Sequence, residues 1–290
     1  MSILQNKIDF ALVIAVEHAN PNGDPLNGNR PRETYDGYGE ISDVCLKRKI
    51  RNRMMDMGQN VFVQPEDRCI DGCKNLKERA KQCAGIQKAG KDKKAYADAA
   101  CAQWLDVRSF GQVFAFTEEK EDGQKSKKGD GVSVGVRGPV SIHPAFSVSP
   151  VRITDIKITK SVSGTAEDKR GSDTMGTKSR VDFGLYTTFG SINCQLAEKT
   201  GFTEEDADCI KEALRTLFEN DTSAARPDGS MQVVRLYWWK HNCKNGQYSS
   251  AKVHHSLHVK AKTDTPRSAD DYDYICDTLE GLTPEVYDER

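Results

Sequence analysis

Basic side chains gathered at a few places are the residues of this chain best suited to binding chemistry. The 290 residues hold 42 Lys and Arg against 43 Asp and Glu, for a formal net charge of −1. Residues 264–290 carry a net −7, so the preceding residues carry +6. Five bases and no acid fall between residues 44 and 55, and eight bases stand against two acids between 74 and 94. Such clusters suit a polyanion, with solvated surface as the alternative for any one of them.

One of these clusters falls on a predicted helix. Ser42 is a suitable N-cap, and Asp43 favours the positive end of the helix dipole. The apolar stripe of this helix consists of Leu46, Ile50, Met54 and Met57. Beside that stripe, at about 100° per residue, three cations share one flank: Lys47, Arg48 and Arg51. A strip of phosphate groups could lie along this flank.

The sequence lacks the standard signatures of catalytic and cofactor sites. It contains no GxxxxGK[ST], HExxH or GxSxG motif, and no GxGxxG between a strand and a helix. Cys69, Cys73 and Cys83 are four and ten residues apart without a nearby His, which disfavours zinc. His254 and His258 are assigned to the outward face of a strand. We therefore expect no catalytic residue, no metal and no cofactor.

Cysteine usage and hydropathy indicate the compartment. The chain has nine cysteines, an odd number without the tight framework of a secreted scaffold, so reduced thiols are expected. No apolar run approaches the ~20 residues of a membrane helix, and the first ten residues are too polar for a signal peptide. We expect a cytoplasmic protein with no membrane contact.

The pattern of elements predicts an α+β fold. Residues 8–16 form a buried strand, followed by an irregular loop over 18–40, the helix described above and a helix-prone insertion over about 60–103. The remaining expected elements are strands at 106–116, 129–142, 151–160 and 181–193, a polar hairpin tip at 161–180, a helix from Thr203, and strands at 231–241 and 252–262 joined by a tight hairpin at Asn245-Gly246. Their order is that of a ferredoxin-like βαββαβ sheet carrying insertions.

Residues 108–115 (RSFGQVFA) match half of the RNA-recognition strand pattern. They agree with it at Arg108, Phe110, Gly111 and Val113, and fail at its other fixed positions. Period-two counting places Arg108, Phe110 and Phe114 on one side of the predicted strand. Two aromatics on a strand are more often core, but a four-stranded sheet of this kind is a scaffold on which bases stack.

Several longer motifs carry a family resemblance. They are HANPNGDP (18–25), NRPR (29–32), ISDVCLKRKIRN (41–52), DVRSFG (106–111) and GVRGPV (135–140). With them the chain resembles the backbone subunit, of the RAMP superfamily, of CRISPR Cascade surveillance complexes, type I-C in particular. The resemblance implies a single domain with an RNA-recognition-motif palm, a finger insertion near 60–103, a long β-hairpin thumb near 150–185 and an acidic C-terminal segment at 264–290.

The resemblance also implies a function. Copies of the subunit stack head to tail along the guide RNA (crRNA) and present it for pairing with invading target DNA, in antiviral defence. The implied partners are guide RNA, target DNA through the guide, other copies of the chain, other Cascade subunits and, indirectly, a recruited nuclease-helicase. The expected RNA-binding residues are Asn20, Asn22, Arg30, Arg32, Lys47, Arg48, Arg51, Arg108, Phe110, Arg137, Lys160, Met175, Lys178 and Arg180. Met175 is the candidate wedge between stacked bases.

Two other classes of function stay open. Related type III backbone subunits cut RNA with a loop aspartate, and Asp24 and Asp36 lie in the corresponding loop. A carboxylate with a divalent ion could promote in-line attack on a phosphodiester. A sequence-specific RNA-binding regulator is the third class, and it would discriminate between guides of equal length, which we do not expect.

Overall fold

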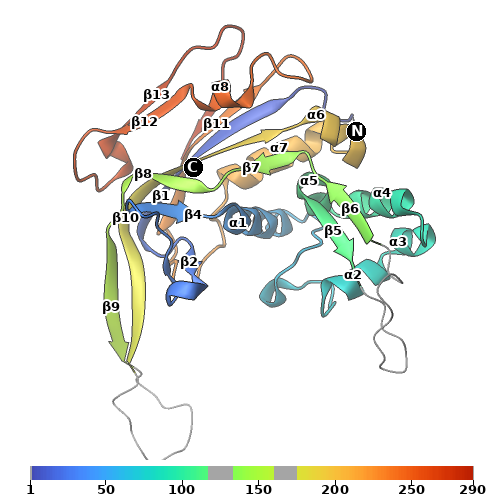
Figure 1. Ribbon diagram of the computed structural model, residues 1–290, viewed down its shortest axis with the longest axis horizontal. Helices are drawn as coiled ribbons and strands as arrows, with labels where there is room; N and C mark the ends of the chain where they lie inside the picture. The colour runs from blue at the N-terminus through green and yellow to red at the C-terminus, as the bar shows by residue number, and fades with distance from the viewer. Residues whose placement is uncertain (1, 117–132, 160–174, 290) are drawn as a thin grey trace, which may run out of the picture.

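The computed structural model describes residues 2–116, 133–159 and 175–289 (Figure 1). Its main element is an eight-stranded antiparallel sheet with the path β14-β11-β1-β10-β8-β4, and β7 and β9 also pair with β10. At its centre β1 (Ile8–Ala19) lies between β10 (Met175–Ile192) and β11 (Met231–Lys240). The predicted first strand is confirmed, and its unbroken apolar run is explained by packing on both faces of the sheet.

Helices cover one face of the sheet. They are α1 (Asp43–Asp56), α6 (Cys194–Thr200) and α7 (Glu204–Arg215). The Ser42 side chain accepts a hydrogen bond from the Cys45 amide, and Thr203 and Asp206 form a capping box. Both predicted helix starts are confirmed. The main hydrophobic core lies between these helices and the sheet, and Leu46, Ile50 and Met54 of the predicted stripe are buried in it.

The opposite face is covered by α8 (Ser250–His254) and by the hairpin of β12 (Leu257–Ala261) and β13 (Tyr272–Cys276). The predicted strand over 252–262 is therefore wrong in its first half, because Ser249 caps a helical turn there. The predicted tight turn is wrong too. A type I′ turn needs positive φ at both central residues, but of Asn245 and Gly246 only Gly246 has it, at 83°.

The insertion has a hydrophobic core of its own, built around Phe62, Trp104 and Phe114. It contains η2 (Glu66–Arg68), α2 (Leu76–Gln82), α3 (Ala84–Ala89), α4 (Lys93–Gln103), α5 (Leu105–Phe110), β5 (Gly111–Ala115) and β6 (Ser133–Arg137). The predicted strand at 106–116 is wrong over its first half, which is α5. Arg108, Phe110 and Phe114 therefore do not share one side of a strand.

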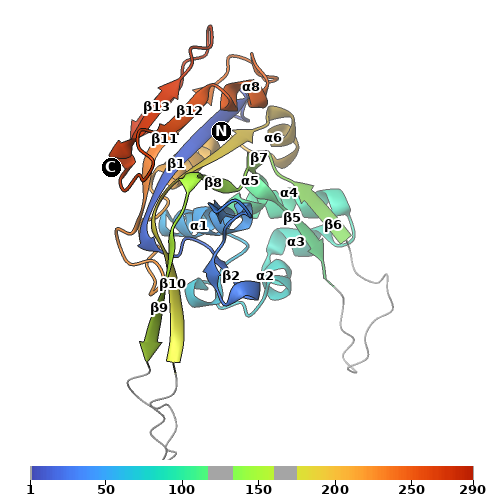
Figure 2. The same cartoon turned by 60° about the vertical axis from the view of Figure 1, so that its left-hand side comes forward.

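A two-stranded extension leaves the sheet at β10. There β9 (Ile153–Thr159) pairs with β10 from Val181 to Met175, and the pair points away from the body (Figures 1 and 2). Residues 161–174 of the predicted polar tip lie outside the described residues. Between β6 and this extension the strand is interrupted at Gly138 and Pro139. It continues as β7 (Val140–Ile142) and β8 (Ala145–Pro150).

The predicted loop over 18–40 is mostly irregular. It contains β2 (Gly23–Asp24), η1 (Pro25–Asn27), β3 (Arg30–Pro31) and the start of β4 (Tyr38–Ile41), which ends the sheet beside β8.

The acidic C-terminal segment belongs to the fold. It contains η3 (Ala269–Asp271), β13 and β14 (Glu285–Asp288), and β14 pairs with β11. Asp288 pairs with Arg235, and Glu285 pairs with Lys211. These acids therefore lie on a segment that is part of the sheet, and both side chains stay exposed. Within the described residues, no helix is long and apolar enough to span a membrane.

Candidate nucleic-acid interface

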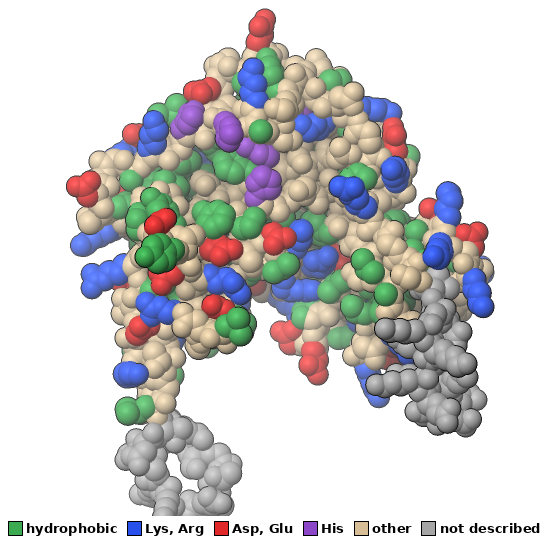
Figure 3. Space-filling view, viewed as in Figure 1, with side chains coloured by type: hydrophobic (Ala, Val, Ile, Leu, Met, Phe, Trp, Pro, Cys, Tyr) green, Lys and Arg blue, Asp and Glu red, His purple; other side chains and the backbone are tan. Residues whose placement is uncertain are grey.

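A hollow lies between the β9–β10 hairpin and the insertion. In the space-filling view these two parts descend on either side of the body, and Lys and Arg side chains gather beneath α1 (Figure 3). The loop over 20–32 lies beside α1, since Asn22 Oδ1 accepts hydrogen bonds from the amide and the hydroxyl of Ser42 at 2.9 and 2.7 Å. Most of the predicted binding residues therefore belong to elements that border one concave surface.

The three cations of the α1 flank have different roles. Lys47 is partly exposed and pairs with Asp43 at 3.1 Å, one helical turn earlier. Arg48 donates to the Val63 carbonyl at 2.8 Å, and burial, followed by the nearby Arg51, lowers the pKa of its guanidinium. Both arginines thus hold the insertion onto α1, and their contact with RNA, like that of Lys47, stays a prediction.

Asp106 is the centre of this attachment. Its side chain is 1% exposed and accepts hydrogen bonds from the amides of Phe62 and Val63 at 2.7 and 3.1 Å. Arg51 Nε donates to the same carboxylate at 2.9 Å, and its guanidinium lies 5.0 Å from the Phe110 ring centroid. Phe110, which was predicted to bind RNA, is thus packed against an arginine of its own chain.

Arg108 is also engaged within the chain. Its Nε and Nη2 each donate to Asp206 at 2.8 Å, and its Nη1 donates to the Cys101 carbonyl. The bond to Asp206 raises the pKa of the Arg108 guanidinium despite burial. A bidentate pair of this kind fixes α5 against the start of α7. Arg108 thus joins the insertion to the body, and its contact with RNA stays a prediction.

The predicted residues of the 20–32 loop mainly shape it. Asn20 is 5% exposed and its Nδ2 donates to the Asn29 carbonyl at 2.7 Å, which leaves its Oδ1 buried without a partner. Arg30 pairs with Asp155 on β9 and so ties the loop to the hairpin. Arg32 lies 3.6 Å from Asp24 and keeps a buried Nε without a partner. Of the two arginines, Arg32 has the more exposed side chain, at 36% against 28% for Arg30.

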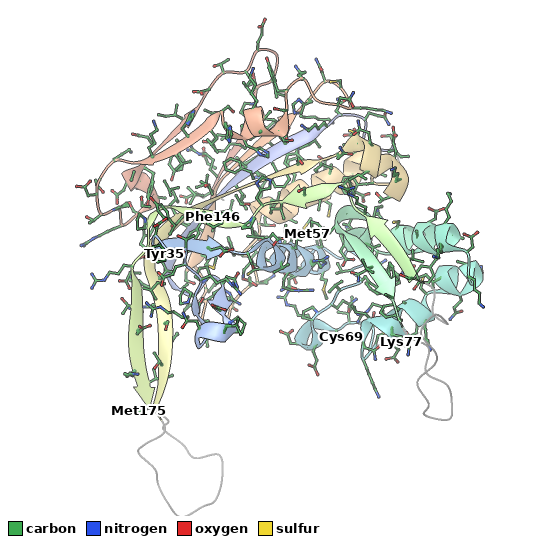
Figure 4. All side chains as sticks on the ribbon, viewed as in Figure 1. Tyr35, Met57, Cys69, Lys77, Phe146 and Met175 are labelled. Atoms are coloured by element: carbon green, nitrogen blue, oxygen red, sulfur yellow. The ribbon has the colours of Figure 1, made fainter. Side chains whose placement is uncertain are left out.

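The base of the hairpin supplies further cations. Arg180 has a buried Nε without a hydrogen-bond partner, and Lys178 Nζ donates to the Ala224 carbonyl at 2.6 Å. Met175 is 66% exposed, and it lies on β10 opposite Thr159 rather than in a loop (Figure 4). Arg137 is exposed at the end of β6. Lys160 lies outside the described residues.

Sequence reasoning missed Arg226. Its Nη1 donates to the Asn20 carbonyl at 3.4 Å, and its buried Nε lies 3.7 Å from Asp221, an ion pair without a hydrogen bond. Together with Arg32 and Lys49 it places positive charge around Cys45 on α1. No local sequence pattern indicates a binding role for this residue, because its loop comes near α1 only in the folded chain. A lone arginine beside Pro227 and Gly229 carries no signal of binding.

A buried polar network lies under the other face of the sheet. Asp9 is fully buried, and it contacts Lys7 at 3.0 Å, His241 at 2.8 Å and His254 at 3.5 Å. Burial acts to raise the pKa of Asp9, but hydrogen bonds from His241, His254, Ser250 and Lys7 outweigh it and hold the pKa well below its usual value. The prediction of an outward His254 is wrong, because the residue is 7% exposed on α8.

Two of the three cysteines considered for zinc, Cys69 and Cys73, have other contacts. Cys69 Sγ lies 3.4 Å from Asp71 Oδ1, and Cys73 Sγ lies 3.2 Å from Gln82 Oε1. Over residues 2–116, 133–159 and 175–289, no three His, Cys, Asp or Glu side chains are grouped as metal ligands would be.

Comparison with known proteins identifies the family. The family profile described as CRISPR-associated protein Cas7 matches residues 6–277, nearly the whole chain. This chain belongs to the Cas7 family. The Cas7 of Haloferax volcanii is 26% identical over 242 residues, which cover 80% of this chain and 69% of the relative.

Two solved structures can be compared with this Cas7-family chain. One comes from a CRISPR RNA-guided surveillance complex in a pre-nicking state, with 15% identity and a TM-score of 0.45 over 80% of this chain and 78% of the other. A second, from a CRISPR RNA-guided surveillance complex, has 16% identity and a TM-score of 0.44 over 80% and 68% of the two chains.

Proposed function

We propose that this chain is a backbone subunit that binds crRNA, of which several copies line the guide in a Cascade-like surveillance complex. Membership of the Cas7 family over residues 6–277 is the observation that carries this proposal. The basic hollow beneath α1 supports it, because a polyanion needs a continuous cationic surface. The fold brings cations from three separate segments together there. The direct partners are crRNA, further copies of the chain and other Cascade subunits. Target DNA is reached through the guide, and the nuclease-helicase is an indirect partner.

The sheet is proposed to be an RNA-recognition-like palm. Its support is the order β11, β1, β10, β8, with α1 and α7 as the two connecting helices on one face, which is the βαββαβ arrangement. The insertion near 60–103, with its separate core, is proposed as the finger, and the β9–β10 extension near 150–185 as the thumb. The motifs HANPNGDP and ISDVCLKRKIRN support assignment to type I-C.

Binding is proposed to be independent of guide sequence. The charged donors around the hollow are guanidinium and ammonium groups, which recognise phosphates in any sequence. Pairing between guide and target then supplies the specificity. Arg32, Lys47, Arg180 and Arg226 are the residues that we assign to phosphate contact, and Met175 stays the proposed wedge.

We also propose that the subunit does not cleave. Asp24, the aspartate considered for an RNase, accepts a hydrogen bond from the Leu26 amide and pairs with Arg32. These contacts give Asp24 a structural role. Asp36 is exposed in the turn before β4. Cleavage of complementary RNA by the assembled complex with magnesium, abolished by Asp24→Ala or Asp36→Ala, would contradict this proposal.

The direct test is co-expression of the chain with a guide array. Size exclusion, absorbance and gel analysis of the purified material should reveal a large ribonucleoprotein with RNA of uniform length. Unrelated guides of equal length should bind equally. A chain that carries no RNA even when the other subunits of the complex are co-expressed would refute the proposal.

A further inference from the structure

An exposed aromatic patch lies at the edge of the sheet. Tyr35 is fully exposed, Tyr38 is 37% exposed and Phe146 is 43% exposed. In the register of β4 and β8, Glu40 lies opposite Phe146, and Tyr38 lies opposite Pro150. Strand side chains alternate between faces, so these four side chains share the outward face of the two strands. We call Tyr35, Tyr38 and Phe146 the aromatic patch.

Two carboxylates border the aromatic patch. Glu40 stands beside Phe146 within it, and Asp36 is exposed next to Tyr35. Neither carboxylate forms an ion pair with any residue that the structure describes. Exposed aromatic rings beside unpaired carboxylates suit a basic protein surface, whereas the carboxylates would repel a nucleic acid.

The insertion carries the complementary charge. Among its exposed lysines, five form no ion pair within the described part of the chain: Lys74, Lys81, Lys88, Lys91 and Lys93. Lys94 pairs only with Asp98 of its own helix. Lysine side chains cover aromatic rings with their methylene stems while their ammonium groups meet carboxylates. This surface, over residues 74–94, therefore fits the aromatic patch in both charge and chemistry.

The two surfaces lie on opposite sides of the molecule. Tyr35 and Phe146 lie beside the root of the β9–β10 hairpin, and Lys77 marks the insertion on the far side (Figure 4). The line between the two surfaces runs along the longest axis of the molecule (Figure 1). A surface and its complement at opposite ends of one chain cannot meet within that chain. They can meet between copies, and such a heterologous contact produces an open array.

We propose that the aromatic patch, with Asp36 and Glu40, docks on the lysine surface at 74–94 of the next copy of this chain. The inference rests on the proposed function, in that it names the surfaces through which copies along the guide touch. A nucleic acid bound to the insertion would explain the lysines but would leave the aromatic patch uncovered. A second copy accounts for both.

Photo-cross-linking tests the contact directly. The photoreactive amino acid p-benzoylphenylalanine replaces Tyr35, and the same label at Leu26, which is 98% exposed, serves as the control. Irradiation is performed on the RNA-bound protein and on nuclease-treated protein at high concentration, so the contact is scored with or without RNA. We expect the label at position 35 to join peptides from residues 74–94 of another copy. Cross-links from that position to other segments, or none above the control, would refute the proposal.

Charge reversal tests the same contact by function. Asp36→Lys with Glu40→Lys, and separately Lys88→Glu with Lys91→Glu, should each weaken assembly about tenfold in sedimentation, since like charges then face each other. All four changes in one chain should restore assembly. Affinity for a short RNA that spans one copy should stay unchanged throughout. If the lysine variant loses affinity for that RNA and the fourfold variant is not rescued, the insertion binds nucleic acid and the proposal is wrong.

Discussion

Removal of the Asp106 carboxylate should detach the insertion from the body. The carboxylate is buried and accepts three hydrogen bonds, from two backbone amides and from Arg51. Asp106→Ala leaves these three donors without their acceptor. A buried donor left unpaired costs about 1–3 kcal/mol, and breaking a buried ion pair costs about 3–5 kcal/mol. These costs overlap, so we expect a loss of roughly 3–5 kcal/mol in the attachment of the insertion.

The assay is hydrogen exchange combined with urea unfolding. The insertion has a core separate from that of the sheet, so amides of residues 62–114 should lose protection first while those of β1, β10 and β11 keep theirs. Asp98→Ala is the matched control, because Asp98 is 55% exposed and pairs with Lys94 only at the surface. That variant should lose less than about 1 kcal/mol. A uniform loss of protection in Asp106→Ala, or a loss as small as that of the control, would refute the reasoning.

Three further predictions follow from single contacts. The pKa of Asp9 lies below its unfolded value, so its contribution to stability is present above about pH 4 and is lost as the pH falls below that value. The difference in unfolding free energy between the wild type and Asp9→Asn should therefore shrink from pH 7 to pH 3. A difference that stays constant with pH would contradict this prediction. Ser42→Ala removes the N-cap of α1 and should cost about 1 kcal/mol in thermal or urea unfolding, whereas the exposed Ser133→Ala should be neutral. Arg180→Ala should weaken binding of every guide alike and reduce the slope of log K against log salt by about 0.7 per lost contact; an unchanged slope would remove Arg180 from the interface.

Local sequence was sufficient wherever an element is specified by its own residues. Ser42 with the stripe of α1, and Thr203 with the acids that follow it, carry both their cap and their buried face within one segment, so both helices were predicted correctly. The apolar run of β1 likewise predicted a central strand. The segment at 105–110 was misassigned because its spacing of aromatics also fits a strand, and only Asp106, by accepting the Phe62 and Val63 amides, makes the helix the stable choice. The segment at 250–256 was misassigned for a similar reason, since His254 is directed inward by Asp9 and the Gly190 carbonyl.

The sequence by itself determined which segments are basic and so predicted the binding of a polyanion, because charge and motif are properties of single residues and their neighbours. It could not determine which cations remain free to bind. Arg48, Arg51 and Arg108 read as an RNA-binding set, but each is held by an acceptor 15 or more residues away, at Val63, Asp106 and Asp206. Arg226 joins the basic hollow from a loop that shows no motif. Only the tertiary structure decided this, because a guanidinium binds whichever carboxylate or carbonyl the fold brings near it, and that distance is not encoded in any local pattern.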